Sequence, residues 1–156
     1  MLPLMIAVCV TVLDQWTKSI VRANFDLFEN IVLIPGVFDL RYIQNTGAAW
    51  GLFAGAHMLL AMLSLLVLGA MVIWQRYFFR SCMMDRIAFG LLAGGITGNF
   101  IDRVRLQYVV DFLDFHWQGR HFPAFNVADS AICIGVGILL LSQFLVARAE
   151  YLARKS

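Results

Sequence analysis

Four long apolar stretches dominate the chain, and each is a candidate membrane-spanning helix. We place them at about residues 4–21, 57–75, 87–101 and 127–147. About 20 apolar residues let a helix cross the ~30 Å hydrocarbon core of a bilayer. The pattern predicts a mainly α membrane protein with four transmembrane helices, in a single domain that covers residues 1–156.

Glycines recur at every fourth position in the third stretch. Gly90, Gly94 and Gly98 are spaced so that they share one face of a helix. Small residues in this arrangement let two helices approach closely in a membrane. We therefore expect this face to pack tightly against another helix.

The segment between the first two stretches has strand patterns. Residues Ile31–Ile34 form an apolar run that predicts a strand, and Pro35-Gly36 after it predicts a turn. Residues 38–42 alternate apolar and charged side chains, which predicts a half-buried strand. We expect a small β-cradle outside the membrane, followed by a short surface helix within residues 45–55.

Composition supports a membrane location. The chain is 61% hydrophobic and only 14% charged, whereas soluble domains carry about 25% charged residues. The net charge of +2 gives no reason to expect nucleic-acid binding.

The chain has three cysteines, an odd number without zinc-ligand spacing. We expect Cys9 and Cys133 to be buried. No Lys or Arg precedes Asp14, so we expect the first span to be retained rather than cleaved as a signal peptide.

Positive charges predict the orientation, because loops rich in Lys and Arg remain cytoplasmic. Such residues occur between the second and third spans and in the C-terminal tail: Arg76, Arg80, Arg86, Arg148, Arg154 and Lys155. Both termini are therefore expected in the cytoplasm, with residues 22–56 and 102–126 outside. Arg103, Arg105 and Arg120 run against this rule, and we assign Arg103 to the functional site.

Two aspartates are candidates for chemistry because apolar residues flank them. Asp111 lies within the run Val109–Leu113, and Asp129 lies at the start of the fourth span. An unpaired carboxylate is costly in such surroundings. Simpler interpretations exist for both. Asn126 and Asp129 suit the cap and first turn of a helix, and Asp111 suits a solvated loop.

More polar residues cluster at the end of the third span. Asp102 opposes the helix dipole there and needs a partner. Arg103 or Arg105 could be that partner, and we favour a supporting role in which Asp102 holds Arg103 in place. Asn99 lies one turn earlier. Asp14 lies inside the first span, where an acid indicates function by default. Its alternative role is an ion pair with Lys18, four residues later.

Two carboxylates without another good nucleophile suggest an aspartic mechanism. Close approach of Asp111 and Asp129 would make the pair share one proton. Asp111 and Asp114 have the spacing of a weak magnesium motif, but no phosphate cradle accompanies them. We expect His116 and His121 to be interface residues rather than ligands. No metal and no cofactor are therefore predicted.

Other classes of membrane protein remain as alternatives. A proton-coupled transporter would carry acids in the middle of several spans, whereas here only Asp14 lies well inside one. A lipid-modifying metal enzyme would use Asp111 and Asp114. A purely structural membrane protein would leave the clustered Asn and Asp residues unexplained.

Five sequence blocks together resemble those of the bacterial lipoprotein signal peptidases, also called signal peptidase II. They span nearly the whole chain in the order of the family: Asp14-Gln15-x-Thr17-Lys18, Asn45-Thr46-Gly47-Ala48-Ala49, Gly98-Asn99-x-x-Asp102-Arg103, Val109-Val110-Asp111-Phe112 and Phe125-Asn126-x-Ala128-Asp129. Any one block alone would be weak, but the set is specific.

The resemblance implies a four-span aspartic endopeptidase of the bacterial inner membrane, with its active site near the outer face. It implies removal of signal peptides from lipidated prolipoproteins, before a diacylglyceryl-modified cysteine, and inhibition by globomycin. It assigns catalysis to Asp111 and Asp129, although Asp102 fits the pattern as firmly as Asp111. The residues implied to line or support the site are Asn45, Asn99, Arg103, Asn126, Asp14 and Asp102.

Overall fold

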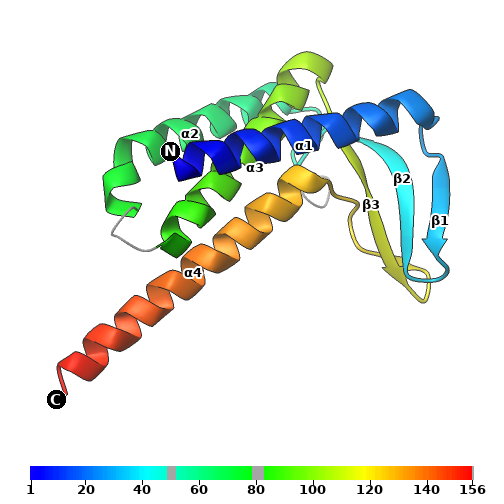
Figure 1. Cartoon of the computed structure of the whole chain (residues 1–156). Helices are drawn as coiled ribbons and strands as arrows, with labels where there is room; N and C mark the ends of the chain where they lie inside the picture. Colours follow the sequence, from blue (N-terminus) through cyan, green and yellow to red (C-terminus); the bar gives the residue numbers. More distant parts are fainter. Residues whose placement is uncertain (49–51, 79–82, 156) are drawn as a thin grey trace.

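The computed structural model describes residues 1–48, 52–78 and 83–155, and within them four helices meet one antiparallel sheet (Figure 1). The helices are α1 (Leu2–Asn24), α2 (His57–Phe78), α3 (Met83–Leu106) and α4 (Val127–Ala153). The strands are β1 (Asn30–Ile34), β2 (Phe38–Asn45), β3 (Val109–Trp117) and β4 (Arg120–His121). Their order in the sheet is β1-β2-β3-β4.

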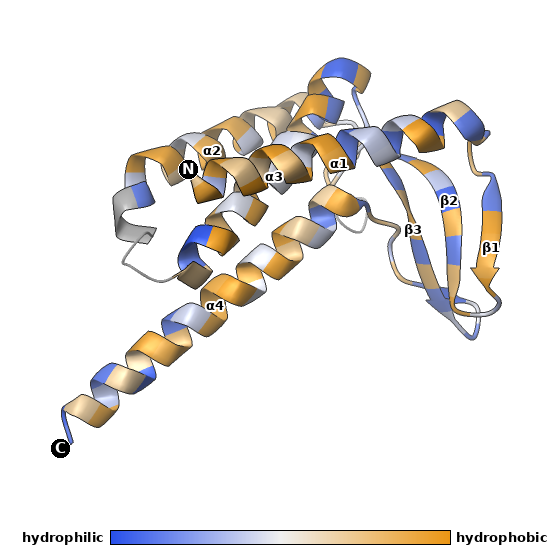
Figure 2. Cartoon of the chain, viewed as in Figure 1, coloured by the Kyte–Doolittle hydropathy of each residue, from blue (hydrophilic) through white to orange (hydrophobic). Residues whose placement is uncertain are grey.

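Three of the four predicted spans have the length and hydropathy that a bilayer requires. Within the described residues these are Leu2–Asn24, His57–Gln75 and Val127–Ala153, and Figure 2 shows the apolar residues along them. The helix α3 lies outside this group because charged residues occupy both of its ends, including Asp85, Asp102 and Arg103. A fourth span therefore stays a prediction.

The predicted glycine stripe on α3 is confirmed as a helix-packing surface. A Cβ atom added at Gly94 would lie 2.7 Å from the Ala7 carbonyl oxygen of α1, and one at Gly90 would lie 2.7 Å from Ile6 Cβ. On another side of α3, Gly95 lies against the Ala128 backbone of α4. The glycines thus let α3 contact two neighbouring helices at backbone distance.

The predicted strands are present, but the sheet is larger than expected. The turn between β1 and β2 includes Gly36 in the left-handed region, with φ of +76°. The strands β3 and β4 were not expected from the sequence, and their connection places Gln118 and Gly119 at φ of +50° and +76°. Positive φ at two successive residues suits a tight hairpin.

Two other expectations differ from the structure. Residues 46–48 and 52–56 form bends and turns rather than the predicted surface helix, and residues 49–51 lie outside the described part. The prediction of buried Cys9 and Cys133 is wrong, since both are exposed. Cys9 lies on α1, and Cys133 lies on α4, where it lines a cavity. Cys82 lies outside the described residues.

A small apolar cluster fixes the sheet to the helices. Val21 from α1 packs with Tyr42 from β2 and with Val110 and Phe112 from β3, and all four are at most 6% exposed. These contacts place one end of β3 beside the ends of α1 and α3 (Figure 1). The sheet therefore sits over one end of the helices, where α4 begins.

We predict that Gly94→Ala will destabilise the protein by about 1–3 kcal/mol, the usual cost of overpacking a close contact. The added methyl would collide with the Ala7 backbone. Gly69→Ala on α2 is the matched control, because nothing lies within 4 Å of its added Cβ. Thermal unfolding in detergent measures both variants. Equal melting temperatures for the two would contradict the close packing of α1 on α3.

Candidate active site

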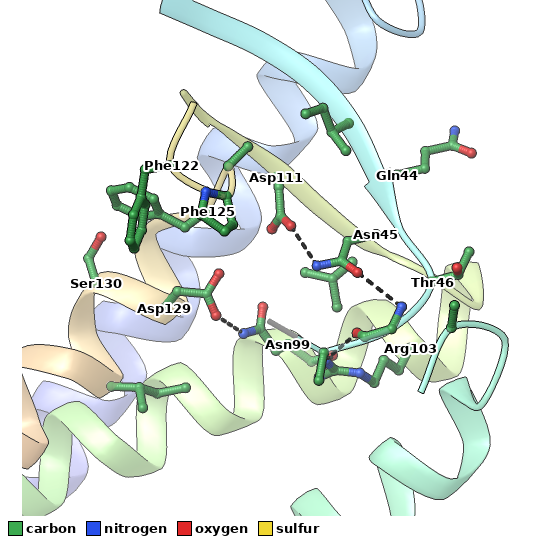
Figure 3. A pocket seen from close by; sticks show the side chains of 18 of the residues that line it. Gln44, Asn45, Thr46, Asn99, Arg103, Asp111, Phe122, Phe125, Asp129 and Ser130 are labelled. Carbon is green, nitrogen blue, oxygen red and sulfur yellow. Dashed lines mark hydrogen bonds between the residues drawn. The ribbon is translucent and has the colours of Figure 1, made fainter. Parts of the chain in front are cut away.

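A cavity of about 660 Å³ lies where β2 and β3 meet α3 and α4. Asp111 from β3 and Asp129 from α4 both line it, and Figure 3 shows the two carboxylates pointing into the same space. Asn45, Asn99 and Arg103 also line the cavity. Five of the eight residues predicted for the site therefore converge here.

Asp129 has the helix-capping role that the simpler interpretation expected. The Asn126 side chain accepts a hydrogen bond from the Asp129 backbone N–H at 2.9 Å, and the Asn126 N–H donates to Asp129 Oδ2 at 3.3 Å. Such a capping box satisfies the unpaired N–H groups at the helix start. Asp129 Oδ1 is left to face the cavity, where Asn99 Nδ2 donates to it at 2.7 Å. The cap thus positions the Asp129 carboxylate but uses only one of its two oxygens.

Asp111 is not a solvated loop residue. It lies within β3 and is only 2% exposed. Asn45 Nδ2 donates to its Oδ2 at 2.9 Å, and Asn126 Nδ2 donates to its Oδ1 at 2.8 Å. Both oxygens of the buried carboxylate are therefore held by amide groups.

The three asparagines have fixed orientations, because each amide oxygen faces a different donor. The oxygen of Asn45 accepts from the Gly47 N–H at 2.9 Å (Figure 3). The Asn126 oxygen is taken by the helix cap, and the Asn99 oxygen accepts from Lys18 Nζ at 2.9 Å. An amide side chain whose oxygen is committed must turn its NH₂ group the other way. In all three residues, that group donates to Asp111 or Asp129.

Lys18 is the residue whose importance to the site the sequence did not reveal. Its side chain is 2% exposed, and its ammonium lies 2.8 Å from Asp14 Oδ2 and 3.0 Å from Asp102 Oδ2. The predicted Asp14–Lys18 pair is thus present but has a third member. Asp14 also accepts from the Ala128 N–H at 2.9 Å, so the same carboxylate holds the first turn of α4. The spacing of Asp14 and Lys18 was the available signal.

The predicted pairing of Asp102 with Arg103 is wrong. Consecutive residues on a helix point in different directions, and Asp102 turns toward Lys18 and toward the Val110 N–H, 3.1 Å away. Arg103 instead donates to the carbonyl oxygens of Gly47 at 3.3 Å and Asn99 at 3.4 Å. Asp102 is not among the residues that line the cavity. It ties β3 to α3 just before Asp111.

Burial gives Asp111 an unusual acidity. Loss of hydration, followed by repulsion from Asp129, raises the pKa of Asp111 from 3.8 to about 7, although the amide donors Asn45 and Asn126 oppose the shift. A carboxyl with a pKa near neutrality can hold or release a proton under physiological conditions. The geometry therefore joins two carboxylates in one cavity, at least one of which exchanges its proton near pH 7.

The Asp111-x-x-Asp114 magnesium motif is not formed. Successive side chains of a strand alternate between its faces, so residues three apart lie on opposite faces. Asp111 faces the cavity, whereas Asp114 contacts His121 at 2.9 Å. The two carboxylates therefore cannot chelate one ion together.

The family model described as "Signal peptidase (SPase) II" matches residues 6–145. The chain belongs to the signal peptidase II family. It is 43% identical over 145 residues to the lipoprotein signal peptidase of Syntrophotalea carbinolica, covering 90% of this chain and 89% of that protein. It is 42% identical over 148 residues to that of Symbiobacterium thermophilum, covering 95% and 97%.

Solved structures of a bacterial membrane enzyme share the fold of this chain. A bacterial membrane enzyme solved by the in meso method at 2.3 Å resolution aligns with a TM-score of 0.82 and 34% identity. The alignment covers 91% of this chain and 87% of that one. A second such structure, at 1.9 Å resolution, aligns with a TM-score of 0.79, covering 90% and 91%. Family membership and the apolar helices together identify the chain as a membrane peptidase.

The raised pKa of Asp111 makes a prediction about stability. The unfolded carboxyl loses its proton near pH 3.8, and the folded one near pH 7. Stability is therefore complete at lower pH and is lost as the pH rises between these values. Asp111→Asn lacks this loss, so its melting temperature should exceed that of the wild type by a few degrees at about pH 8, and by less at about pH 5. Thermal unfolding across this range measures the difference, and parallel curves would contradict the shift.

Proposed function

We propose that this chain is an aspartic endopeptidase that removes signal peptides from prolipoproteins, cutting before the diacylglyceryl-modified cysteine. Asp111 and Asp129 form the catalytic pair. The observation that carries the proposal is their convergence in one cavity, from β3 and α4, with oriented N–H donors on all four carboxylate oxygens. Signal peptidase II membership supplies the substrate class.

The first chemical step requires one proton on the pair. The ionised carboxylate takes a proton from water as the water oxygen attacks the scissile carbonyl carbon. The protonated carboxyl gives its proton to the carbonyl oxygen at the same time. The product is a tetrahedral diol, and the pair again carries one proton, now on the other residue.

The second step reverses the roles. The newly protonated carboxyl donates to the nitrogen of the scissile bond, and the other carboxylate removes a proton from the diol. The C–N bond breaks, releasing the signal peptide with a free carboxylate and the lipoprotein with a cysteine at its amino end. The pair returns to its starting state, so no metal or cofactor enters the cycle.

The supporting residues hold this pair in place. Asn45, Asn99 and Asn126 orient the carboxylates through neutral amides. Arg103 fixes the Gly47 carbonyl beside the cavity, where it can position the substrate backbone. Asp14 and Asp102 act through Lys18 and through the backbone of Ala128 and Val110.

The cavity walls suit a lipidated peptide. Apolar side chains, including Ile43, Phe122, Phe125 and Ile132, line it beside the two acids. We propose that the signal helix and acyl chains arrive laterally from the membrane, whereas water enters from the outer face. A globomycin-type cyclic peptide should occupy the same cavity and compete with the substrate.

Asp111→Asn and Asp129→Asn should each reduce cleavage of a lipidated precursor by at least about 10³-fold, because neither proton transfer can then occur. Asp85→Asn is the matched control. Asp85 is also buried, at 4% exposure, but it bonds Ser142 near the other end of α3. The measurement is the initial cleavage rate of the purified enzyme, with and without EDTA.

Two outcomes would overturn this assignment. Substantial turnover by a folded Asp111→Asn or Asp129→Asn enzyme would remove that residue from the pair. Complete loss of wild-type activity in EDTA, restored by added metal, would replace the aspartic mechanism with a metal-dependent one. Substrate binding without turnover in both variants is the expected result.

We also propose an inner-membrane topology with four spans and both termini in the cytoplasm. The basic residues of the tail support it. Reporter fusions after Ser156 should be cytoplasmic, and fusions within residues 107–121 should be external. An external C-terminus would overturn this topology.

A further inference from the structure

The face of β3 opposite Asp111 carries a second group of polar side chains, defined here as the outer-face cluster: Asp114, His116 and His121. Asp114 and His116 are two residues apart on the strand and so share a face. His121 joins them because it pairs with His116 across the β3–β4 hairpin. Asp114 is 2% exposed, whereas the His121 side chain is 48% exposed. The cluster is thus anchored in the protein and open on one side.

The three side chains are close enough to share one ion. One ligand atom from each lies within 4.8 Å of the others. His121 Nδ1 lies 2.9 and 3.0 Å from the two oxygens of Asp114, and the imidazole rings of His116 and His121 stack with centroids 4.8 Å apart. Ligands on a tetrahedral ion lie roughly 3.3 Å apart, so only small side-chain rotations separate the cluster from that geometry.

Unsatisfied polar atoms gather at the same place. Over the described residues, only two buried side-chain atoms lack a hydrogen-bond partner, and they are His116 Nδ1 and Asp39 Oδ1. Asp39 is the cross-strand partner of Asp114 and therefore lies on the same face. Buried polar atoms without partners call for an explanation, such as an ion or water. Both atoms can be satisfied by a cation, Asp39 through water bound to the ion.

The charge around the cluster also favours a cation. Asp114 and Asp39 bring two carboxylates to this face, and the nearest positive group is Arg41, whose Nη1 lies 3.9 Å from Asp114 Oδ2. Arg41 is partly exposed, with 38% of its side chain accessible, so it can turn into solvent when an ion takes its place.

We propose that Asp114, His116 and His121 form a binding site for a divalent transition-metal ion of the zinc class. Two imidazoles and one carboxylate are ligands that suit Zn²⁺, with water at the fourth position. Bound metal would tie β4 to β3. The segment that follows β4 includes Phe122 and Phe125, which line the catalytic cavity, so the ion would brace one cavity wall. It takes no part in the chemistry, because Asp111 lies on the other face of β3.

The test uses the untagged full-length chain in detergent, stripped of metal with EDTA and then dialysed. Titration calorimetry with Zn²⁺ should show one site, and Zn²⁺ should raise the melting temperature. His116→Ala and His121→Ala should each weaken binding at least tenfold and remove the thermal shift. His57→Ala is the matched control, because these are the three histidines of the chain and His57 lies at the start of α2.

Each of these measurements tests the proposed metal site independently of cleavage activity. No binding to the wild type, unchanged affinity in His116→Ala and His121→Ala, or loss of binding in His57→Ala would overturn the proposal. Co²⁺ bound to the wild type covers the case in which the variants fail to fold. It should give the intense visible bands of tetrahedral coordination, and a spectrum identical to that of Co²⁺ in buffer would also overturn the site.

Discussion

The rest of the site depends on the ion pairs that the buried ammonium group of Lys18 makes. It is enclosed by Asp14, Asp102 and the Asn99 oxygen, all within 3.0 Å. Through Asp14 it fixes the start of α4, and through Asp102 it fixes the start of β3. Removal of this one charge would leave two buried carboxylates unpaired, and breaking a buried ion pair typically costs about 3–5 kcal/mol. A single cation therefore sets the positions of the two elements that carry Asp129 and Asp111.

Neutral amides, rather than cations, make the direct contacts with Asp111 and Asp129, the proposed catalytic pair. A Lys or Arg bonded to Asp111 would favour its ionised form and lower its pKa strongly. The amides of Asn45 and Asn126 orient the carboxylate but leave its pKa near 7. The ammonium of Lys18 stands one residue further back, and its hydrogen-bond link to Asp129 runs through Asn99. This spacing keeps a proton exchangeable on the pair while the geometry stays rigid.

Local pattern was enough to predict the apolar helices, the β1–β2 hairpin and the unusual setting of Asp111 and Asp129. The strand β3 was not predicted, because its first four residues are all buried and the alternation that marks a half-buried strand is present only near its end. The predicted Asp102–Arg103 pair is wrong because consecutive residues on a helix point in different directions. The role of Lys18 depends on Asn99, 81 residues away, and no local pattern carries such a contact.

The hydropathy of α3 also follows from its position among the other helices. It buries eight residues, including Gly94, Asn99 and Asp102, whereas α1 buries three and α4 four. Its acids face protein partners: Asp85 bonds Ser142, and Asp102 bonds Lys18. A helix shielded from lipid by its neighbours does not need an apolar surface, because its polar groups are satisfied inside the protein. The low hydropathy that separates α3 from the other three helices thus suits a central helix enclosed by its neighbours, and the predicted four-span topology is compatible with it.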